Sequence, residues 1–310
     1  MSTTAIQGAP HLKVMRQSPM SLHTTWRIGG PADYLVRVPT PDDFIATVRW
    51  AAGEGLPITV IGGGSNLLVR EGGIRGLVIS CRTPGERAEQ LLGAEDRGDE
   101  VVVRVAAQAP LSWVGRYVSE RGWAGMDWGV GLPGTIGGAT VNNAGAHGTE
   151  MKDALRSVVV IDNNGEVSER SRTWLDPTYR YTTVKAMSRP RDVHVLAVVL
   201  HLPKGDKADL VRLAEEHADY RHQTQPTGAC AGSTFTNPPG DFAGRLLEAV
   251  GLKGFQVGGV SFSTKHANFI VNAGGATATQ VCELIAIAQD RIQSEFGIDL
   301  HPEIEVIGEP

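Results

Sequence analysis

Glycines gathered in short runs constrain this chain more than any other feature. The first run follows the apolar segment 58–61 and comprises Gly62, Gly63, Gly64, Ser65 and Asn66. Because glycine lacks a Cβ, its backbone N–H groups can approach an anion closely, and Ser65 and Asn66 add further donors. The run predicts either a loop that cradles a pyrophosphate or a plain glycine turn. No helix is expected after it, which excludes a Rossmann fingerprint.

A second glycine-rich passage spans residues 129–148. It contains a literal GxGxxG over residues 129–134, but Pro133 stands where a helix should open, and no convincing strand precedes the motif. A dinucleotide site of the Rossmann type is therefore not expected. We predict extended backbone that wraps a flat ligand through Thr135, Gly137, Gly138, Asn143 and Gly145.

The composition describes an ordinary folded protein and argues against several classes of partner. With 310 residues, 41% hydrophobic and 20% charged, the chain is long enough for two domains and too apolar for disorder. Its net charge of -5 and its lack of a Lys/Arg run argue against nucleic acid. Cys81, Cys230 and Cys282 lie far apart without a CxxC pair, so neither a disulfide framework nor a metal site is expected. No apolar run approaches the about 18 residues of a membrane span, and we expect a cytoplasmic protein.

Periodicity and capping residues predict a mixture of helices and strands. A helix is expected over residues 40–53, with Thr40 as its N-cap and Asp43 in the capping-box position. The other expected helices span residues 111–120, 206–220 and 277–296, the last one ended by Gly297. Strands are expected over residues 58–61, 67–69, 101–105, 158–161, 166–168, 193–200 and 301–307. In the last strand, alternation sends Glu303 and Glu305 to one face, and Ile304 and Val306 to the other.

Several polar motifs in the second half carry little information by themselves. Ser233 and Asn237 stand among glycine and proline, where turn formers are ordinary, and their segment is not a nucleophile elbow. Arg180 lies between two tyrosines, a pattern usual for a stacked surface residue. Lys265 fits either an anion site or a polar loop, and a strand carboxylate such as Glu303 is usually solvated. Their order along the chain is more informative than any one of them.

Taken in order, these segments resemble the UDP-N-acetylenolpyruvoylglucosamine reductase family from residue 22 to residue 308. TTWRIGGPA at residues 24–32 is similar to the opening of the family, and IGGGSNLL at 61–68 is similar to its first FAD loop. LPGTIGGATVNNAGAHG at 132–148 resembles the second FAD segment. Substrate and catalytic elements are resembled by Tyr179-Arg180, AGSTFTNP at 231–238, KHANFIVN at 265–272 and Pro302-Glu303.

The resemblance implies an α+β fold, namely the FAD-binding fold of the vanillyl-alcohol-oxidase or PCMH type with two α+β subdomains, followed by an α+β substrate domain. It assigns residues 20–205 to the FAD domain, split near residues 82–100, and residues 206–299 to the substrate domain. Residues 300–310 are expected to form a strand that returns to the FAD domain, and residues 1–19 a flexible N-terminus. The short spacing from Arg180 to Ser233 resembles the subclass without an extra tyrosine-bearing loop.

The implied activity reduces an enolpyruvyl ether to a lactyl ether on a UDP-sugar, in peptidoglycan precursor synthesis, with hydride from NADPH passing through noncovalent FAD. FAD contacts are implied for Gly62, Gly63, Gly64, Ser65, Asn66, Pro133, Gly134, Thr135, Gly138, Asn143 and Gly145. Arg180 and Glu303 would stabilise charge on the substrate carboxylate, and Ser233 would protonate the α-carbon. Substrate contacts are implied for Tyr179, Asn237 and Lys265. We expect a monomer that binds no metal, nucleic acid or membrane.

Three positions depart from the family pattern, and two other functions stay open. His147 stands where the family often has Tyr, Thr236 where Lys or Arg is common, and Glu305 where Arg is common. One alternative is a flavoenzyme of the same fold that oxidises a different alcohol or sugar, for which His147 makes a covalent flavin conceivable. Release of free FAD on denaturation distinguishes the two. The other alternative is a non-enzymatic flavin- or nucleotide-binding module, which has no need for the three catalytic residues together.

Overall fold

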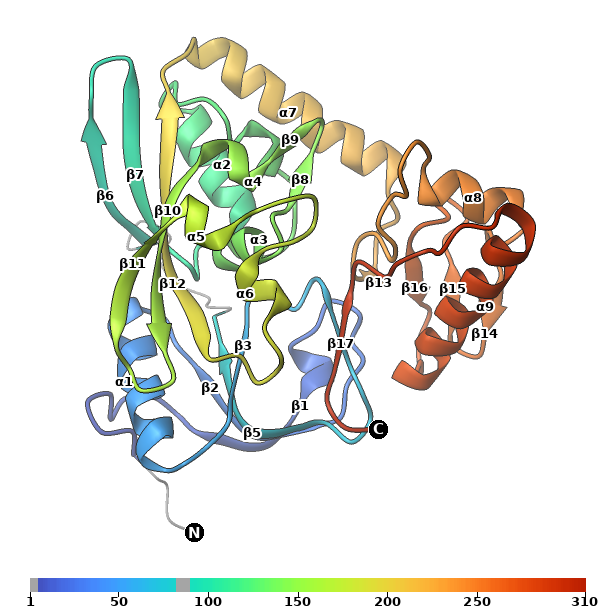
Figure 1. The fold of residues 1–310 in the computed structure, drawn as a ribbon, viewed down its shortest axis with the longest axis horizontal. Helices are drawn as coiled ribbons and strands as arrows, with labels where there is room; N and C mark the ends of the chain where they lie inside the picture. Colours follow the sequence, from blue (N-terminus) through green and yellow to red (C-terminus); the bar gives the residue numbers. More distant parts are fainter. Residues whose placement is uncertain (1–4, 82–89) are drawn as a thin grey trace. The chain divides into compact units, whose positions relative to one another are not determined.

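The computed structural model describes residues 5–81 and 90–310, which form two compact units. Unit 1 comprises Met1–Arg16, Tyr34–Gly63 and Gly76–Tyr220, and unit 2 comprises Gln17–Asp33, Gly64–Arg75 and Arg221–Pro310. Each unit therefore combines segments that are far apart in sequence. One four-stranded sheet has the order β1-β2-β5-β3 (Figure 1). Its strands are β1 (Met15–Pro19), β2 (Pro31–Arg37), β3 (Ile58–Ile61) and β5 (Ile74–Ser80).

A five-stranded antiparallel sheet forms the centre of unit 1, with the strand order β11-β10-β12-β7-β6. The strands are β6 (Leu91–Asp96), β7 (Glu100–Ala106), β10 (Leu155–Asp162), β11 (Val167–Ser171) and β12 (Val193–Pro203). The inner strand β10, between β11 and β12, is buried on both faces. Val158 and Val160 belong to one core cluster, and Val159 and Ile161 belong to another. Apolar β-branched residues suit such a strand, because they pack well on a pleated surface.

Helices cover both faces of this sheet. α2 (Leu111–Ser119), α3 (Ile136–Val141) and α4 (Met151–Ala154) share one core with β7, β10 and β12 (Figure 1). On the opposite face, α1 (Pro41–Gly53) contributes Phe44 and Val48 to a second core that includes Val159 and Leu196. The remaining short elements of unit 1 are η3 (Asp127–Gly129), β8 (Gly145–Ala146), β9 (Thr149–Glu150), α5 (Arg172–Leu175) and α6 (Thr183–Ala186).

Helix α1 confirms the predicted N-cap and corrects one detail of it. The Thr40 hydroxyl accepts a hydrogen bond from the Asp43 backbone N–H at 3.1 Å, as a capping threonine does. The Asp43 carboxylate, however, accepts from the Thr40 hydroxyl at 2.7 Å. The Asp43 side chain is one methylene shorter than the Glu or Gln of a usual capping box, and its carboxylate bonds to the Thr40 hydroxyl instead of the Thr40 backbone N–H.

Unit 2 places an antiparallel sheet beside two helices. The sheet has the order β13-β16-β15-β14, and its strands are β13 (Ala229–Cys230), β14 (Gln256–Val257), β15 (Val260–Phe262) and β16 (Ile270–Asn272). The helices are α8 (Ala243–Ala249) and α9 (Ala278–Phe296), and a 3-10 turn η1 spans Met20–Leu22. The core also contains Trp26, Ile28 and Leu68, so early segments of the chain are part of it. Strand β17 (Glu305–Ile307) pairs in parallel with β4 (Leu67–Val69).

Two long helices confirm their predicted positions. α9 begins after Thr277, whose hydroxyl accepts from the Gln280 N–H at 3.2 Å, while the Gln280 side chain accepts from the Thr277 N–H at 3.2 Å. It ends at Gly297, whose φ of 65° is left-handed and favours glycine. α7 (Lys207–Thr224) matches the helix expected over residues 206–220, and the division between the units falls within it.

Three expectations differ from the structure. The extended backbone expected between residues 129 and 148 is interrupted by α3, whose first turn Thr135 caps. The alternation expected near the C-terminus fails, because Val306 is 37% exposed, whereas Ile304 and Ile307 are buried. Residues 15–19, expected to be flexible, form β1. The predicted domain boundaries stay a prediction, and the split near residues 82–100 falls partly outside the described residues.

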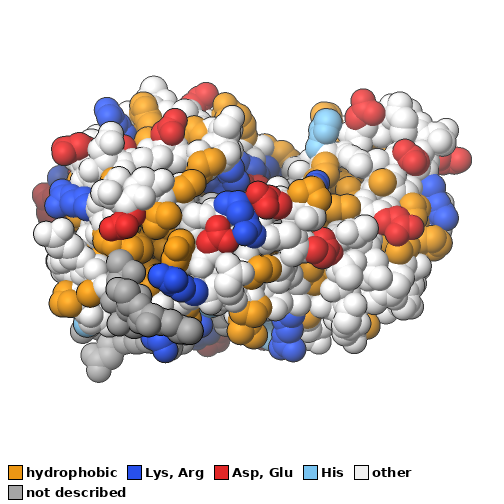
Figure 2. Space-filling view, turned by 90° about the horizontal axis from the view of Figure 1, so that it is seen from below, with side chains coloured by type: hydrophobic (Ala, Val, Ile, Leu, Met, Phe, Trp, Pro, Cys, Tyr) orange, Lys and Arg blue, Asp and Glu red, His pale blue; other side chains and the backbone are white. Residues whose placement is uncertain are grey.

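The surface carries both signs of charge. On the face shown in Figure 2, acidic and basic side chains are interspersed among polar and apolar ones. Across the described part of the chain, no helix combines the length and the apolar character that crossing a membrane requires. Among the same residues, no group of three or more His, Cys, Asp or Glu side chains is arranged to hold a metal ion.

Candidate active site

The two predicted FAD segments cross each other in unit 1. A Cβ placed on Gly63 would lie 2.8 Å from the Gly134 Cα, and one placed on Gly62 would lie 2.5 Å from the Thr135 hydroxyl. Real Cβ atoms do not approach other atoms so closely, so Gly63 allows contact between the two backbones and Gly62 allows contact with the Thr135 side chain. The next glycine, Gly64, belongs to unit 2 and has a φ of 67°. A Cβ there would lie 2.1 Å from the His23 carbonyl oxygen.

Helix α3 shapes the second segment. The Thr135 hydroxyl accepts from the Gly138 N–H at 3.2 Å and so begins the helix. Gly137 is packed against Ala107, since a Cβ on Gly137 would lie 2.6 Å from the Ala107 Cβ. Gly138 is different: its nearest neighbour would be the Thr135 hydroxyl at 3.4 Å, which is an ordinary contact. The protein itself leaves room for a methyl group at Gly138.

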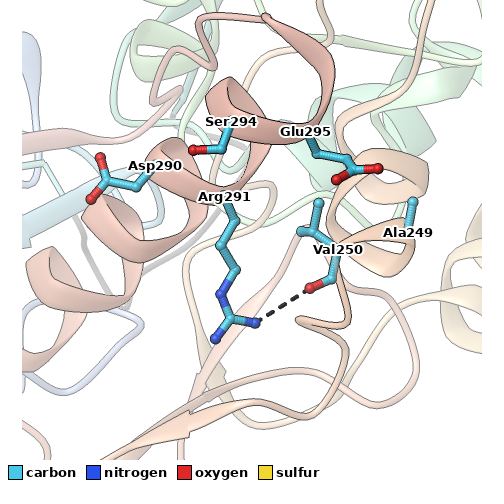
Figure 3. Close-up of a pocket in the computed structure, with 6 residues that line it drawn as sticks. All are labelled: Ala249, Val250, Asp290, Arg291, Ser294 and Glu295. Atoms are coloured by element: carbon cyan, nitrogen blue, oxygen red, sulfur yellow. Dashed lines mark hydrogen bonds between the residues drawn. The ribbon is translucent and has the colours of Figure 1, made fainter.

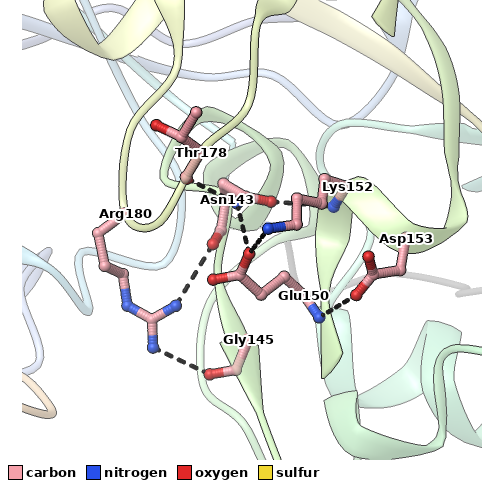
Figure 4. Close-up of polar contacts among 7 residues, drawn as sticks. All are labelled: Asn143, Gly145, Glu150, Lys152, Asp153, Thr178 and Arg180. Carbon is pink, nitrogen blue, oxygen red and sulfur yellow. Dashed lines mark hydrogen bonds and ion pairs between the residues drawn. The ribbon is translucent and has the colours of Figure 1, made fainter. Parts of the chain in front are cut away.

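Asn143 connects four parts of unit 1 (Figure 4). Its side-chain N–H group donates to the Thr178 carbonyl at 2.7 Å and to the Glu150 carboxylate at 3.1 Å, and its oxygen accepts from the Lys152 N–H at 2.9 Å. The residue is buried and has a φ of 40°, a left-handed conformation that asparagine tolerates better than most residues. Asn143 therefore fixes the loop that leads into β8.

Arg180 lies against that loop (Figure 4). Its guanidinium donates to the carbonyls of Asn143, at 3.3 Å, and Gly145, at 3.0 Å. Arg180 itself has a φ of 54°, and left-handed backbone at a non-glycine residue is a form of strain that clusters at functional sites. The ring of Tyr179, which is 47% exposed, lies 5.1 Å from the guanidinium carbon.

In unit 2, Asn268 holds the segment that carries Ser233. The Asn268 carbonyl accepts from the Thr234 N–H at 2.7 Å, and its side-chain amide exchanges two hydrogen bonds with the backbone of Phe235, both at 2.9 Å. The side chain is 3% exposed, so water competes little for these bonds. Burial lowers the pKa of the neighbouring His266, and its neutral Nδ1 can accept the Asn268 N–H at 3.2 Å. Burial also raises the pKa of Cys230, which keeps that thiol protonated.

Glu303 adjoins the same segment. Its backbone N–H donates to the Thr234 carbonyl at 2.8 Å, and its carbonyl accepts from the Asn66 side chain at 3.2 Å. The structure thus brings the predicted residues Ser233 and Glu303 together in unit 2, while Arg180 belongs to unit 1. Asn66, predicted to contact FAD, bonds to the backbone of a predicted catalytic residue.

Two predicted substrate contacts have structural bonds of their own. The Asn237 side chain accepts from the Ala243 N–H at 3.0 Å, in the first turn of α8. The Lys265 ammonium donates to the His222 carbonyl at 2.6 Å, near the end of α7. Both residues still lie on segments adjacent to Ser233 in the fold of unit 2, since Lys265 is three residues before Asn268. Their contact with substrate stays a prediction.

Comparisons with known proteins assign the family. Residues 32–171 match the FAD binding domain family, and residues 223–307 match the family described as UDP-N-acetylenolpyruvoylglucosamine reductase, C-terminal domain. The chain is 40% identical over 290 residues to the UDP-N-acetylenolpyruvoylglucosamine reductase of Chloroflexus aurantiacus, covering 93% of this chain and 96% of that protein. The chain belongs to the UDP-N-acetylenolpyruvoylglucosamine reductase family.

Other relatives of this reductase agree. The Bacillus velezensis enzyme of the same name is 40% identical over 300 residues, covering 96% of this chain and 94% of that protein. The crystal structure of the Thermus caldophilus enzyme has a TM-score of 0.75 and 34% identity, covering 95% of this chain and 98% of that chain. The family resemblance and the predicted FAD-binding α+β fold are confirmed.

The residues of unit 1 fit FAD, the cofactor of this reductase. The crossing glycines expose backbone rather than side chains in both segments, and a Cβ on Gly138 would meet only the Thr135 hydroxyl, at 3.4 Å. Gly62, Gly63, Gly134, Thr135 and Gly138 are the residues of unit 1 that would hold the cofactor.

Two residues that matter in the structure were missed by sequence reasoning. Asn268 stood inside the KHANFIVN motif, but nothing in the sequence distinguished its amide from an ordinary polar loop residue. Gln108 follows a predicted strand and carried no signal at all. Asn268 is revealed by its hydrogen bonds to Phe235, and Gln108 by a buried amide without a hydrogen-bond partner among the described residues.

A shallow hollow in unit 2 contains no predicted site residue (Figure 3). It has a volume of about 510 Å³ and is lined by Ala249, Val250, Asp290, Arg291, Ser294 and Glu295. Arg291 donates to the Val250 carbonyl at 3.3 Å across it. The lining shows neither a buried charge nor a converging set of donors, so we assign it no function.

Proposed function

We propose that this flavoenzyme reduces UDP-N-acetylglucosamine enolpyruvate to UDP-N-acetylmuramate, with NADPH as the hydride donor, for peptidoglycan precursor synthesis. The observation that carries the proposal is the hydrogen bond from the Glu303 N–H to the Thr234 carbonyl at 2.8 Å. It joins the two segments that carry the predicted proton donor and the predicted carboxyl group. The near-complete coverage of relatives that bear this enzyme name supports it.

The protein's part in the reaction is to stabilise charge and to deliver a proton. FAD, when bound, supplies the redox centre that accepts hydride from NADPH and passes it to the sugar nucleotide. Hydride addition to the enolpyruvyl β-carbon sends negative charge into the substrate carboxylate. Arg180 is proposed to bind that carboxylate by charge-assisted hydrogen bonds, and Glu303, in its protonated form, to donate another.

Ser233 is proposed to protonate the α-carbon. A hydroxyl is a weak acid, but an enolate-like carbon is a strong base, so a positioned hydroxyl is adequate. Asn268 supplies the positioning, because it fixes the backbone of the two residues that follow Ser233. Glu303 adjoins the same backbone and is held in register with it.

Further contacts complete the proposal. Tyr179 and Asn237 are proposed to position the substrate, and Lys265 to bind its diphosphate in exchange for the His222 carbonyl. We propose that FAD is held noncovalently, since residues 62–66 and 133–145 are rich in glycine for backbone contact and contain no cysteine. We also propose a monomer in the cytoplasm, a reducing compartment that suits Cys81, Cys230 and Cys282, none of which is in a disulfide.

Replacement of Ser233 tests the proposal. Ser233→Ala should leave the bleaching of flavin absorbance by NADPH nearly intact, because hydride transfer to the cofactor does not require this hydroxyl. Reoxidation by the enolpyruvyl substrate, measured anaerobically by stopped flow, should slow at least the roughly hundredfold typical of a lost general acid. Ser233→Cys should recover part of the rate. Reoxidation of Ser233→Ala at the wild-type rate would remove Ser233 from the mechanism.

A further inference from the structure

Arg180 lies in a tight turn between Thr178 and Tyr181. The backbones of Thr178 and Tyr181 exchange two hydrogen bonds, each at 3.1 Å, so Tyr179 and Arg180 are the two central residues of the turn. Arg180 is the second of them, and its φ of 54° is the left-handed conformation that several turn types require at this position. Glycine and asparagine are the usual residues there, so an arginine in this conformation is strained. Contacts outside the turn therefore have to hold it.

Asn143 contacts both the backbone of this turn and the guanidinium of Arg180 (Figure 4). Its side-chain N–H group donates to the Thr178 carbonyl at 2.7 Å, where the turn begins. Its own carbonyl accepts from the Arg180 guanidinium at 3.3 Å, and the Gly145 carbonyl accepts from the same guanidinium at 3.0 Å. Because backbone carbonyls carry no net charge, these bonds orient the guanidinium without neutralising it. Asn143 therefore influences both where the turn lies and where the guanidinium points.

The Asn143 amide uses both of its N–H donors inside the protein. One is directed to the Thr178 carbonyl and the other to the Glu150 carboxylate, at 3.1 Å, and an asparagine amide has two such donors. The amide oxygen accepts from the Lys152 N–H at 2.9 Å, and the whole residue is 1% exposed. The structure thus commits this amide to holding other parts of unit 1.

The partners of Asn143 are themselves fixed. The Glu150 carboxylate forms an ion pair with the Lys152 ammonium, and the Glu150 N–H donates to the Asp153 carboxylate at 2.8 Å in the capping box of α4. The charge on Glu150 strengthens the hydrogen bond that it accepts from Asn143. A chain of polar contacts therefore leads from the first turn of α4 through Asn143 to Arg180 (Figure 4).

We propose that Asn143 is a positioning residue for Arg180, which sets the orientation in which the guanidinium meets the carboxylate of the enolpyruvyl substrate. This inference rests on the proposed function, in which Arg180 stabilises the charge that hydride addition sends into that carboxylate. It gives the Asn143 side chain a role other than the cofactor contact that the family resemblance implies. A guanidinium that must first reorient stabilises the transition state less than one already in place, so Asn143 acts on the rate through Arg180.

A double-mutant cycle with Arg180 tests the proposal. Asn143→Gly removes the amide, and glycine adopts the φ of 40° at this position readily. With FAD in excess, anaerobic reoxidation of the reduced flavin by the enolpyruvyl substrate should slow about tenfold in Asn143→Gly, and more in Arg180→Ala. In the double variant, loss of the amide should slow reoxidation less than about twofold beyond Arg180→Ala, because residues that act through one another are not additive.

The same measurements separate positioning from a general loss of stability. The slowing in Asn143→Gly should appear in the maximal rate more than in the half-saturating substrate concentration, because the additional charge on the carboxylate develops only in the transition state. If Asn143→Gly does not fold, Asn143→Asp enters the same cycle. Aspartate keeps the size and the oxygen acceptor of asparagine, but its ionised side chain cannot donate to the Thr178 carbonyl.

Asp153→Ala is the matched control. It removes a hydrogen bond from the same network, but that bond goes to the Glu150 N–H in the cap of α4 rather than to the turn of Arg180. The reoxidation rate of Asp153→Ala should stay within about twofold of the wild type, and any slowing should add to that of Arg180→Ala.

Three results would contradict these expectations in different ways. Additive slowing by Asn143→Gly and Arg180→Ala would overturn the proposal and leave Asn143 a structural residue. Loss of FAD binding in Asn143→Gly but not in Asp153→Ala would overturn it as well, because the amide would then be a cofactor contact. Reoxidation of Arg180→Ala at the wild-type rate would instead contradict the proposed function of Arg180 itself, so the failure of the proposed function is distinguishable from the failure of this inference.

Discussion

Glycines in the FAD segments have two distinct physical roles. Gly63 is required by the protein, because a Cβ there would lie 2.8 Å from the Gly134 Cα, and Gly134 has a φ of 107°, which favours glycine. Gly138 has no such requirement, since its nearest neighbour would be at 3.4 Å. The sequence shows only a glycine at each of these positions. The packing in the structure is what distinguishes a glycine that the fold requires from one that leaves room for a ligand.

Gly138→Ala should therefore separate stability from cofactor binding. Alanine in the first turn of α3 should leave the unfolding free energy of the FAD-free protein unchanged or raise it by about 0.5–1 kcal/mol, since glycine is a poor helix former. The added methyl group should weaken FAD binding about tenfold or more through steric conflict. Urea unfolding and fluorescence titration measure the two quantities.

Gly63→Ala is the contrasting variant. It should lower the stability of the FAD-free protein as well, because its Cβ meets backbone that cannot move aside. Wild-type FAD affinity in Gly138→Ala would show that the cofactor does not approach this turn. The same comparison shows how far the sequence could go: it identified the glycine segments, but not which glycines serve the fold.

Elements with strong local signals were predictable, and elements held by tertiary contacts were not. α1 and α9 carry capping residues and apolar periodicity that act within one helix, so both lay where expected. α3 contains two glycines and spans six residues, and its stability comes from the Thr135 cap and from bonds to the loop after β7. No local pattern reports such bonds. The segment that carries Ser233 is similar, since Asn268, more than 30 residues later, holds it.

Asn268→Ala should impair only the part of the reaction that involves Ser233. Loss of the two side-chain hydrogen bonds to Phe235 should leave flavin bleaching by NADPH unchanged and slow reoxidation by the enolpyruvyl substrate about tenfold, because the proton donor is less well positioned. Stopped-flow measurement of the two half-reactions tests this.

Asn272→Ala controls for a general loss of stability. Asn272 lies on strand β16, and its side chain donates to the Trp26 carbonyl at 2.8 Å rather than to the residues that follow Ser233. It should lower stability by about 0.5–1.5 kcal/mol, the net contribution of a typical hydrogen bond, without the selective effect on reoxidation. If reoxidation slows equally in Asn268→Ala and Asn272→Ala, Asn268 has a structural role only and does not position the proton donor.

At the scale of the whole molecule, unit 2 is not a continuous stretch of chain. Its core includes Trp26, Ile28 and Leu68 together with the residues of α8 and α9. The indole N–H of Trp26 donates to the Ile270 carbonyl at 2.8 Å, and β17 pairs with β4 rather than with a neighbour from the C-terminal region. The sequence predicted the segments, but no local pattern showed that Trp26, Ile28 and Leu68 pack into one core with residues after 221.

The C-terminal region should therefore be unstable by itself. A fragment of residues 221–310 contains α8, α9 and the four-stranded sheet, but it lacks β4 and three buried side chains of their core, Trp26, Ile28 and Leu68. Deleting one large buried side chain costs about 3–5 kcal/mol, and small domains have total stabilities of about 5–15 kcal/mol, so this loss is enough to unfold the fragment. Its circular dichroism should show no cooperative urea transition, whereas the full chain should show one.

In the full chain, Trp26→Ala should lower the urea midpoint. Trp174 of unit 1 is only partly buried, so the control Trp174→Ala should have a smaller effect. A fragment that unfolds cooperatively at the urea midpoint of the full chain would show that Trp26, Ile28 and Leu68 are not needed for a stable core in unit 2.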